Sequence, residues 1–205
     1  MRPITALVPI KSRAQCKTRL QHHLDGPQRL LLVRNMLNHV LKVLTKHKAV
    51  GRIVVLTPER DTLDPKVEIL HDQGCDLNSS LTLALQHLKA EGEERVLILP
   101  ADLACLDCND VDQLLAAGNS TAAVIAPSED GTGTNALLIP LNTAFTLSFG
   151  HHSFQAHLRQ FKQVHCTFSV VTSRGLGFDV DTETDLTQVH GRTLACIEGE
   201  RRTAR

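Results

Sequence analysis

The stretch RVLILPADL, residues 95–103, decides how the rest of the sequence is interpreted. After Arg95 it has a run of apolar side chains without polar alternation, which is typical of a strand covered by helices on both faces. Pro100 ends the run, and Asp102 follows shortly after it. We therefore expect a sheet between two layers of helices. Because ligands of such folds bind beyond the carboxyl ends of the strands, we expect polar chemistry at the edge where this strand ends.

The segments on both sides of this strand alternate between strand and helix patterns, which favours an α/β fold with a parallel sheet. The elements expected before it are strands at 4–10, 52–57 and 67–70 and helices at 26–47 and 78–92. Those expected after it are helices at 107–118, 153–161 and 182–191 and strands at 121–127, 135–140 and 165–171. Asn78 is the expected N-cap of its helix. The close pair of strands in the second half predicts a mixed, mostly parallel sheet.

Size and composition limit the possible classes of protein. The chain has 205 residues, 42% of them hydrophobic, and we assign residues 1–192 to one domain and the polar residues 193–205 to a C-terminal tail. Lys plus Arg and Asp plus Glu each number 22, so the basic excess of a general nucleic-acid-binding protein is missing. No apolar run reaches the roughly 18 residues of a membrane span. We expect a cytoplasmic protein with reduced cysteines and no membrane partner.

Acidic residues follow two of the predicted elements. Asp102 would be costly after a buried strand unless it were hydrated, paired or bound to metal. It could also cap the next helix, but Asp107 and Asn109 are better placed for that, so a metal ligand is favoured. In GLGFDVDTETDL, the side chains of Asp179 and Asp181 share one face of an extended segment. Carboxylates completed by phosphates are the usual Mg²⁺ environment.

A different role for Asp181 stays open at this point. Asp181 precedes the last predicted helix, where it could begin a capping box. One carboxylate of the pair would then cap the helix while the other binds the metal. The sequence does not decide whether Asp179 also binds it.

The segment KSRAQCKTRL after the first strand is basic. Lys11, Arg13, Lys17 and Arg19 fall within nine residues. A solvated loop would look the same, but the position at the end of a strand favours phosphate binding. The dinucleotide fingerprint of three spaced glycines is missing here, which lowers an NAD-binding interpretation.

The loop DGTGT, residues 130–134, precedes a buried strand and is awkward for a simple hairpin turn. We expect Gly131 and Gly133 to bring bare backbone N–H groups and threonine hydroxyls close to a small anion. The chain has no Trp or Tyr, so a nucleobase must be recognised by backbone and small polar groups.

The cysteines and histidines of the sequence are not interpreted as a metal site or a redox site. Cys105 and Cys108 form a single C-x-x-C without a second pair, which is a weak zinc or redox signal. The pairs His22–His23 and His151–His152, the latter near His157, are typical of solvated surface histidines rather than of a metal site.

Together these motifs resemble the CofC/FbiD family, the guanylyltransferases of deazaflavin coenzyme F-420 biosynthesis. The resemblance runs from about residue 4 to residue 188. It implies a single-domain fold like that of nucleotide-diphospho-sugar transferases and molybdenum cofactor guanylyltransferases. It also implies GTP as donor, Mg²⁺, and a small phosphorylated three-carbon acid as acceptor. The motifs that carry it are VPIKSRAQCKTRL, VVLTPE, LNSSLTLAL, LPADL, DGTGTNAL, FGHHSFQAH and GLGFDVDTETDL.

The resemblance assigns roles to individual residues. The catalytic residues would be Lys11, Lys17 and Asp102. The nucleotide-binding residues would be Lys11, Lys17, Arg19, Leu77, Asn78 and Ser79. The acceptor-binding residues would be Thr134, Gly150 and Ser153, and the metal ligands Asp102 and Asp181, with Asp179 beside them. The sequence departs from the family at LACLDC, where a Pro-Leu pair more often follows the aspartate.

Several alternatives stay open. The acceptor could be phosphoenolpyruvate, 2-phospho-L-lactate or 3-phospho-D-glycerate, and no residue selects one. Another nucleotidyl transfer, to molybdopterin or a sugar phosphate, would use the same fold. A non-catalytic nucleotide-binding regulator is a further class, which the retained carboxylates disfavour. The oligomeric state also stays open between a monomer and a homodimer. The expected protein partner is a downstream transferase that receives a labile product.

Overall fold

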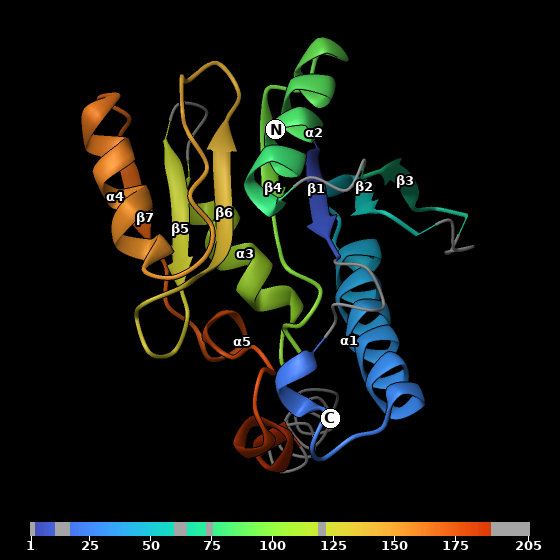
Figure 1. Cartoon of the computed structure of the whole chain (residues 1–205). Helices are drawn as coiled ribbons and strands as arrows, with labels where there is room; N and C mark the ends of the chain where they lie inside the picture. The colour runs from blue at the N-terminus through green and yellow to red at the C-terminus, as the bar shows by residue number, and fades with distance from the viewer. Residues whose placement is uncertain (1–2, 11–16, 60–64, 73–75, 119–121, 190–205) are drawn as a thin grey trace, which may run out of the picture.

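A computed structural model describes residues 3–10, 17–59, 65–72, 76–118 and 122–189 (Figure 1). The described strands are β1 (Ile4–Pro9), β2 (Val50–Thr57), β3 (Glu68–His71), β4 (Arg95–Ile98), β5 (Ala123–Pro127), β6 (Thr134–Pro140) and β7 (Phe168–Val170). The helices are the 3-10 turn η2 (Thr18–Leu20), α1 (Gly26–Lys46), α2 (Leu77–Ala90), α3 (Cys108–Ala117), α4 (Ser153–Gln163) and α5 (Arg174–Gly177). Residues 183–189 are also helical.

The described strands form one mixed sheet in the order β3-β2-β1-β4-β6-β5-β7. β1 pairs parallel with β2 and with β4, and β5 pairs parallel with β7. β6 runs antiparallel to both of its neighbours, β4 and β5. The start of β6 therefore lies at the same edge as the ends of β1 and β4, which confirms the predicted mixed, mostly parallel sheet.

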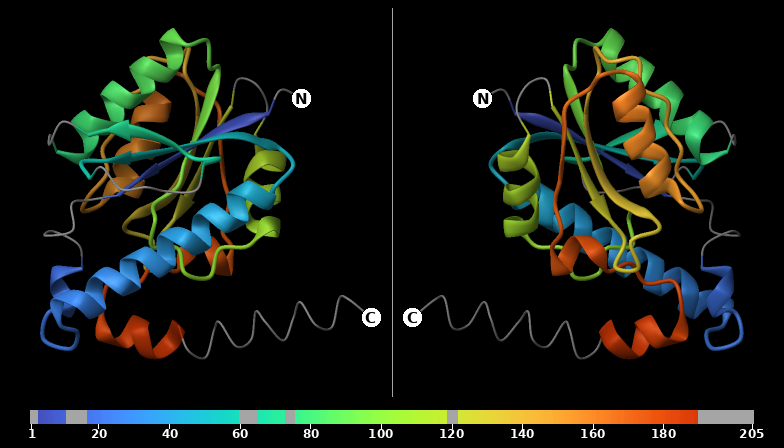
Figure 2. Two further views of the ribbon diagram at one scale, coloured as in Figure 1. Left: turned by 90° about the vertical axis from the view of Figure 1, so that its right-hand side faces the viewer. Right: turned by 90° about the vertical axis from the view of Figure 1, so that its left-hand side faces the viewer.

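Helices cover both faces of the sheet (Figure 2). α1, α3 and α5 pack on one face, and α2 and α4 pack on the other. Strand β4 contributes to both hydrophobic cores, because Leu97 points to the first face while Val96 and Ile98 point to the second. This double burial is the reason that the strand reads as an uninterrupted apolar run.

The caps define the helix ends. Asp25 begins α1 with a capping box to Gln28, and Asp107 begins α3 with a capping box to Asp110, as expected for Asp107. The expectation that Asn78 caps α2 is wrong. Asp76 caps this helix and accepts hydrogen bonds from the amides of Asn78 and Ser79. Asn78 itself lies in the first turn of α2, and its own amide is one of the two that the Asp76 carboxylate accepts from.

Two further differences concern short elements. The strand expected at 165–171 is shorter and covers only β7, and the one-turn helix α5 was not expected. Ser173 caps α5 by accepting a hydrogen bond from the amide of Leu176. Within the described parts of the chain, no helix combines the length and apolar character that crossing a membrane requires.

Candidate active site

Segments that are far apart in the sequence converge at the edge where β1 and β4 end (Figure 1). Lys17 lies after β1, Asp102 lies after β4, and Asp179 and Asp181 follow α5. The chain passes from β1 outward to β2 and β3 and then returns to β4 on the other side of β1. This edge is therefore a topological switch point, the usual ligand position in such sheets.

Asp102, Asp179 and Asp181 form an acidic cluster. Each offers a carboxylate oxygen, and these oxygens lie within 4.8 Å of one another. Lys17 bridges two of the acids, since its Nζ donates to Asp102 Oδ2 and to Asp181 Oδ1, both at 2.7 Å. The Lys17 side chain is 9% exposed, whereas those of Asp102 and Asp181 are 27% and 43% exposed. The predicted convergence of two distant acidic segments with the basic segment is confirmed as geometry.

The electrostatics of the acidic cluster follow from burial and mutual repulsion. Burial alone would lower the pKa of the Lys17 ammonium, but the charges of Asp102 and Asp181 and the hydrogen bonds to them raise it. Burial, followed by the nearby charge of Asp102, raises the pKa of Asp179. Lys17 also has a left-handed backbone with φ of 50°, which a residue other than glycine keeps only when its surroundings hold it.

The acidic cluster fits a divalent cation. Asp102 Oδ1 is buried and accepts no hydrogen bond from the described residues. Such an oxygen is costly unless another partner satisfies it. When all are ionised, three carboxylates and one ammonium leave two negative charges, which a divalent cation would balance. Oxygen ligands of this kind suit Mg²⁺, which stays a prediction.

Neighbouring side chains hold the two C-terminal acids in place. Asn135, the second residue of β6, donates to Asp179 Oδ1 and to the carbonyl oxygen of Gly177, both at 3.1 Å. The alternative that a capping box begins at Asp181 is not what the structure shows, since the box begins one residue later. Thr182 Oγ1 accepts from the amide of Asp185 at 3.3 Å, and Asp185 Oδ2 accepts from the amide of Thr182 at 2.7 Å. The Asp181 carboxylate therefore faces Lys17 rather than the helix.

Of the basic segment at residues 11–19, the structure describes one further basic side chain besides Lys17, and this side chain also faces the acidic cluster. Arg19 Nη1 lies 3.5 Å from Asp181 Oδ2, and its side chain is 73% exposed. Arg19 is therefore available to a larger anion at this edge. Lys11 and Arg13 lie outside the described residues.

The start of α2 carries the predicted base-side residues Leu77, Asn78 and Ser79. Asp76 holds the amides of Asn78 and Ser79 and accepts a hydrogen bond from the Ser79 hydroxyl. The Asn78 side chain clamps a neighbouring loop, because it donates to the carbonyl of Phe149 at 3.0 Å and accepts from its amide at 2.7 Å. Asn78 thus joins the predicted nucleotide segment to the predicted acceptor segment.

The loop 130–134 is organised differently from the expectation. The amide of Gly131 donates to the carbonyl of Ser128, that of Thr132 to Asp130 Oδ1, and that of Gly133 to Ser128 Oγ at 2.7 Å. The prediction that the glycine amides bind an anion is therefore not supported, since the loop itself uses them. Gly131 serves the turn with φ of 71°, and a Cβ at Gly133 would crowd Ser128 Oγ at 2.9 Å.

The predicted acceptor residues lie close together on the face covered by α4. Thr134 is buried at the start of β6, and its Oγ1 lies 3.0 Å from Nδ1 of His157 on α4. Ser153 is buried at the start of α4, where its amide donates to the carbonyl of Gly150 at 3.2 Å. Gly150 has φ of 128°, a conformation that favours glycine.

Sequence reasoning missed two residues of this region, Asn135 and His157. Asn135 was the first residue of a run interpreted as a buried strand, and a polar residue at the start of such a run was the available signal. His157 was grouped with the surface histidines, but it is fully buried, whereas His151 and His152 are exposed as expected. Only its position among the apolar residues of an amphipathic helix distinguished it.

The cysteines carry no metal site in the described structure. Cys105 is buried in a hydrophobic cluster with Met36, Phe178 and Val180, and Cys108 is exposed at the start of α3. Across the described ranges, the acidic cluster is the sole group of three or more metal-ligating side chains close enough to share an ion.

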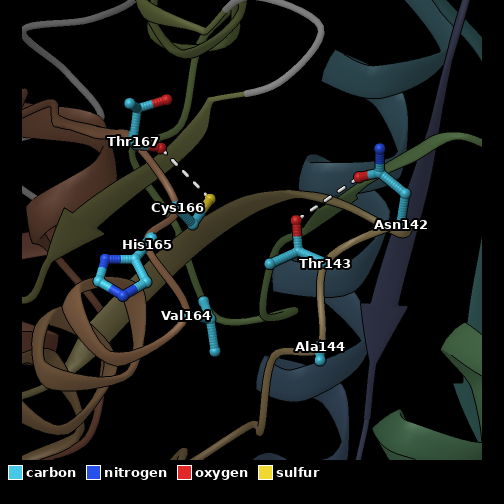
Figure 3. A pocket seen from close by; sticks show the side chains of 7 residues that line it. All are labelled: Asn142, Thr143, Ala144, Val164, His165, Cys166 and Thr167. Carbon is cyan, nitrogen blue, oxygen red and sulfur yellow. Dashed lines mark hydrogen bonds between the residues drawn. The ribbon is translucent and has the colours of Figure 1, made fainter.

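A pocket of about 630 Å³ lies at the other edge of the sheet (Figure 3). Its lining residues are Asn142, Thr143, Ala144, Val164, His165, Cys166 and Thr167. Asn142 follows the end of β6, whereas Thr134 begins it, so roughly 20 Å of extended strand separates this pocket from the acidic-cluster edge. The residues that line the pocket include no carboxylate, in contrast to the acidic cluster at the switch point.

The chain is similar in sequence to guanylyltransferases. The family model described as guanylyl transferase CofC like matches residues 4–198. The phosphoenolpyruvate guanylyltransferase of Sphaerobacter thermophilus is 30% identical over 190 residues, which cover 91% of this chain and 92% of that protein. The 2-phospho-L-lactate guanylyltransferase of Methanothermobacter thermautotrophicus is 33% identical over 193 residues, covering 91% and 84%.

Solved structures support the fold. A putative nucleotide-diphospho-sugar transferase from Desulfovibrio desulfuricans superposes with a TM-score of 0.74 at 20% identity, covering 91% of this chain and 85% of that one. A 4-diphosphocytidyl-2C-methyl-D-erythritol synthase superposes with a TM-score of 0.65 at 16% identity, covering 94% and 100%. The predicted nucleotide-diphospho-sugar-transferase-like fold is therefore confirmed.

Proposed function

Because the chain belongs to the guanylyl transferase CofC-like family, we propose that it transfers GMP from GTP to a small phosphorylated three-carbon acid, in the biosynthesis of coenzyme F-420. Relatives at 30% and 33% identity are named for phosphoenolpyruvate and for 2-phospho-L-lactate. These two acids and 3-phospho-D-glycerate are the proposed candidate acceptors.

The observation that carries this proposal is the acidic cluster with Lys17 at the switch point of the sheet. A phosphate oxygen of the acceptor attacks the α-phosphorus of GTP, and a new P–O bond forms there. The bond from the α-phosphorus to the oxygen that bridges to the β-phosphate breaks, and pyrophosphate leaves with that electron pair. Because both reactants are phosphates, this chain's main tasks are positioning and charge stabilisation, and no side chain has to act as a nucleophile.

The residues of the acidic cluster have separate tasks in this proposal. Asp102 and Asp181 hold Mg²⁺, with Asp179 beside them, and the ion would offset the negative charge on the reacting phosphate oxygens. Lys17 holds the carboxylates of Asp102 and Asp181 together and adds positive charge beside them. Arg19, at the exposed side of Asp181, binds the triphosphate together with Lys11.

The acceptor binds beside the start of β6 in this proposal. Thr134 and Ser153 supply hydroxyl groups, and Gly150 allows the loop between them to approach the small acid. Asp76 already accepts from the amides of Asn78 and Ser79, so these amides do not bind the guanine base directly. The start of α2 instead forms the wall of the site beside the base.

The test is turnover with defined substrates. The purified chain is incubated with Mg²⁺, GTP and one of the three acids, and pyrophosphate release is measured beside product mass. ATP and CTP serve as donor controls. The product is expected to be labile, so the downstream transferase of the pathway is added in a parallel reaction to trap it. Pyrophosphate release that depends on one acid and on GTP supports the proposal. Guanine-nucleotide binding without pyrophosphate release from any acid would instead indicate a non-catalytic regulator.

A further inference from the structure

His157 is the buried histidine on α4, and both of its ring nitrogens are engaged. Nε2 lies 2.9 Å from the backbone nitrogen of Ser148, and Nδ1 lies 3.0 Å from Thr134 Oγ1. The imidazole is completely buried. Phe145 and Phe149 flank it, with ring centroids 5.6 and 5.0 Å away. The ring therefore has one orientation and two fixed partners.

The position of the imidazole proton follows from these partners. A backbone amide only donates, so Nε2 must accept from Ser148 and carries no proton. A neutral imidazole then has its single N–H at Nδ1, which donates to Thr134 Oγ1. Burial lowers the pKa of His157 to about 4, which agrees with a neutral ring at pH 7.

The Thr134 hydroxyl is oriented as a consequence. Its oxygen accepts the Nδ1–H of His157, so its own O–H proton must point away from the ring, toward another acceptor atom. The oxygens of a carboxylate or a phosphate accept hydrogen bonds and do not donate when ionised. The Thr134 hydroxyl, whose oxygen is already in use, can only donate. It therefore favours an anionic group, which only accepts, over a neutral group that has to donate a hydrogen bond of its own.

We propose that His157 is a positioning residue that fixes the Thr134 hydroxyl as a donor to the anionic acceptor substrate. Through Ser148, the same ring fixes the backbone that leads to Gly150, and the Asn78 side chain clamps the adjacent Phe149. Both sides of the acceptor site are thereby tied to one buried imidazole. This inference rests on the proposed function, because it takes Thr134 to bind the acceptor.

Two variants separate the two hydrogen bonds of His157. In His157→Asn the side-chain amide nitrogen takes the place of Nδ1, so donation to Thr134 is kept and acceptance from Ser148 is lost. In His157→Gln the amide oxygen takes the place of Nε2, so acceptance from Ser148 is kept and donation to Thr134 is lost. His87→Gln, on the exposed side of α2, is the matched control.

The kinetic expectation is a split between the two substrates. His157→Gln raises the KM for the phosphorylated acid about tenfold and leaves the KM for GTP within twofold. His157→Asn stays within threefold of the wild type for both, because Asn78 still holds the backbone of Phe149 when the bond to Ser148 is lost. In a Thr134→Val background, His157→Gln causes no further rise in the acceptor KM, because the hydroxyl through which it acts is gone. A structural defect would instead add to the effect of Thr134→Val.

A measurement on the wild-type protein keeps the inference testable if a variant fails to fold. Nitrogen-15 spectra of the histidine rings at pH 7 should show His157 as the Nδ1–H tautomer. An Nε2–H tautomer, or a protonated ring, would overturn the inference whether or not the chain is active. Turnover by the wild type with an unchanged acceptor KM in His157→Gln would also overturn it. Absence of turnover with all three acids contradicts the proposed function instead. The tautomer then still shows whether His157 donates its Nδ1–H to Thr134.

Discussion

The two carboxylate oxygens of Asp102 have different surroundings. Oδ2 accepts a hydrogen bond from Lys17, whereas Oδ1 is buried and accepts none from the described residues. An asparagine keeps the shape and one oxygen but removes the negative charge that a divalent cation requires. Substitution at this position therefore tests the metal assignment without a large change in packing.

We expect Asp102→Asn to lower kcat at least 100-fold, since loss of about 3 kcal/mol of charge stabilisation corresponds to that factor. The fold should survive, because Lys17 keeps its contact with Asp181. Pyrophosphate release measures the first effect and urea unfolding the second. Asp112→Asn is the control, since Asp112 is 71% exposed on α3 and pairs with His47. Activity within threefold of the wild type would remove Asp102 from the metal site.

His157 predicts a component of the pH dependence of stability. Burial lowers its pKa in the folded protein to about 4, below its ordinary value of 6.5. Between these values the unfolded chain binds the additional proton, so the stability that the neutral ring contributes is present above pH 6.5 and is lost as the pH falls toward 4. The shift corresponds to about 3 kcal/mol in the free energy of unfolding.

Urea unfolding of the wild type and of His157→Asn at several values between pH 4 and 7 measures this component. The wild type should lose more stability than the variant as the pH falls, whatever the difference at pH 7. His87→Gln should follow the wild type. Parallel profiles for the wild type and His157→Asn would contradict the buried neutral imidazole.

At the scale of elements, the sequence predicts a helix or strand well where its signal is local. The apolar run of β4 and the cap of α3 at Asp107 depend on neighbouring residues only. Local rules were weaker where two capping residues compete. Asp76 lies two residues before Asn78, and Thr182 directly follows Asp181, so several polar residues satisfied the same pattern.

The one-turn helix α5 connects the acidic cluster to α3. Gly175 packs against the side chain of Asp110, near the start of α3, and against the carbonyl of Cys105. Asp179 and Asp181 follow this helix after two and four residues. A side chain at Gly175 would therefore push apart α5 and the start of α3 and displace both acids.

We expect Gly175→Ala to lower the free energy of unfolding by roughly 1–3 kcal/mol, the usual cost of overpacking. It should also lower kcat about 10- to 100-fold, since small displacements of catalytic groups have effects of that size. Gly26→Ala is the matched control, because a Cβ at Gly26, the first residue of α1, meets no atom within 4 Å. Unfolding curves and pyrophosphate release measure both effects. Equal behaviour of the two variants would show that α5 does not position the acids.

At the scale of the whole molecule, the converging segments were predictable and their side-chain partnerships were not. A rule about strand ends was sufficient to place Lys17, Asp102 and Asp181 at one edge. The contacts of Asn135 with Asp179 and of Thr134 with His157 join residues 44 and 23 positions apart. Such pairs depend on the register of β6 and on the packing of α4. No local pattern in the sequence encodes either of these.

The acidic cluster joins segments from the beginning, middle and end of the chain, so binding of a divalent cation should stabilise the whole fold. At a Mg²⁺ concentration of about ten times its dissociation constant, the gain is about 1.4 kcal/mol. For a domain of this size, that corresponds to a rise in Tm of roughly 3–5 °C. Thermal unfolding with and without MgCl₂, at constant ionic strength, measures the rise. Asp181→Asn should abolish most of it, and Asp112→Asn should retain it. An equal rise in Asp181→Asn would place the cation elsewhere on the molecule.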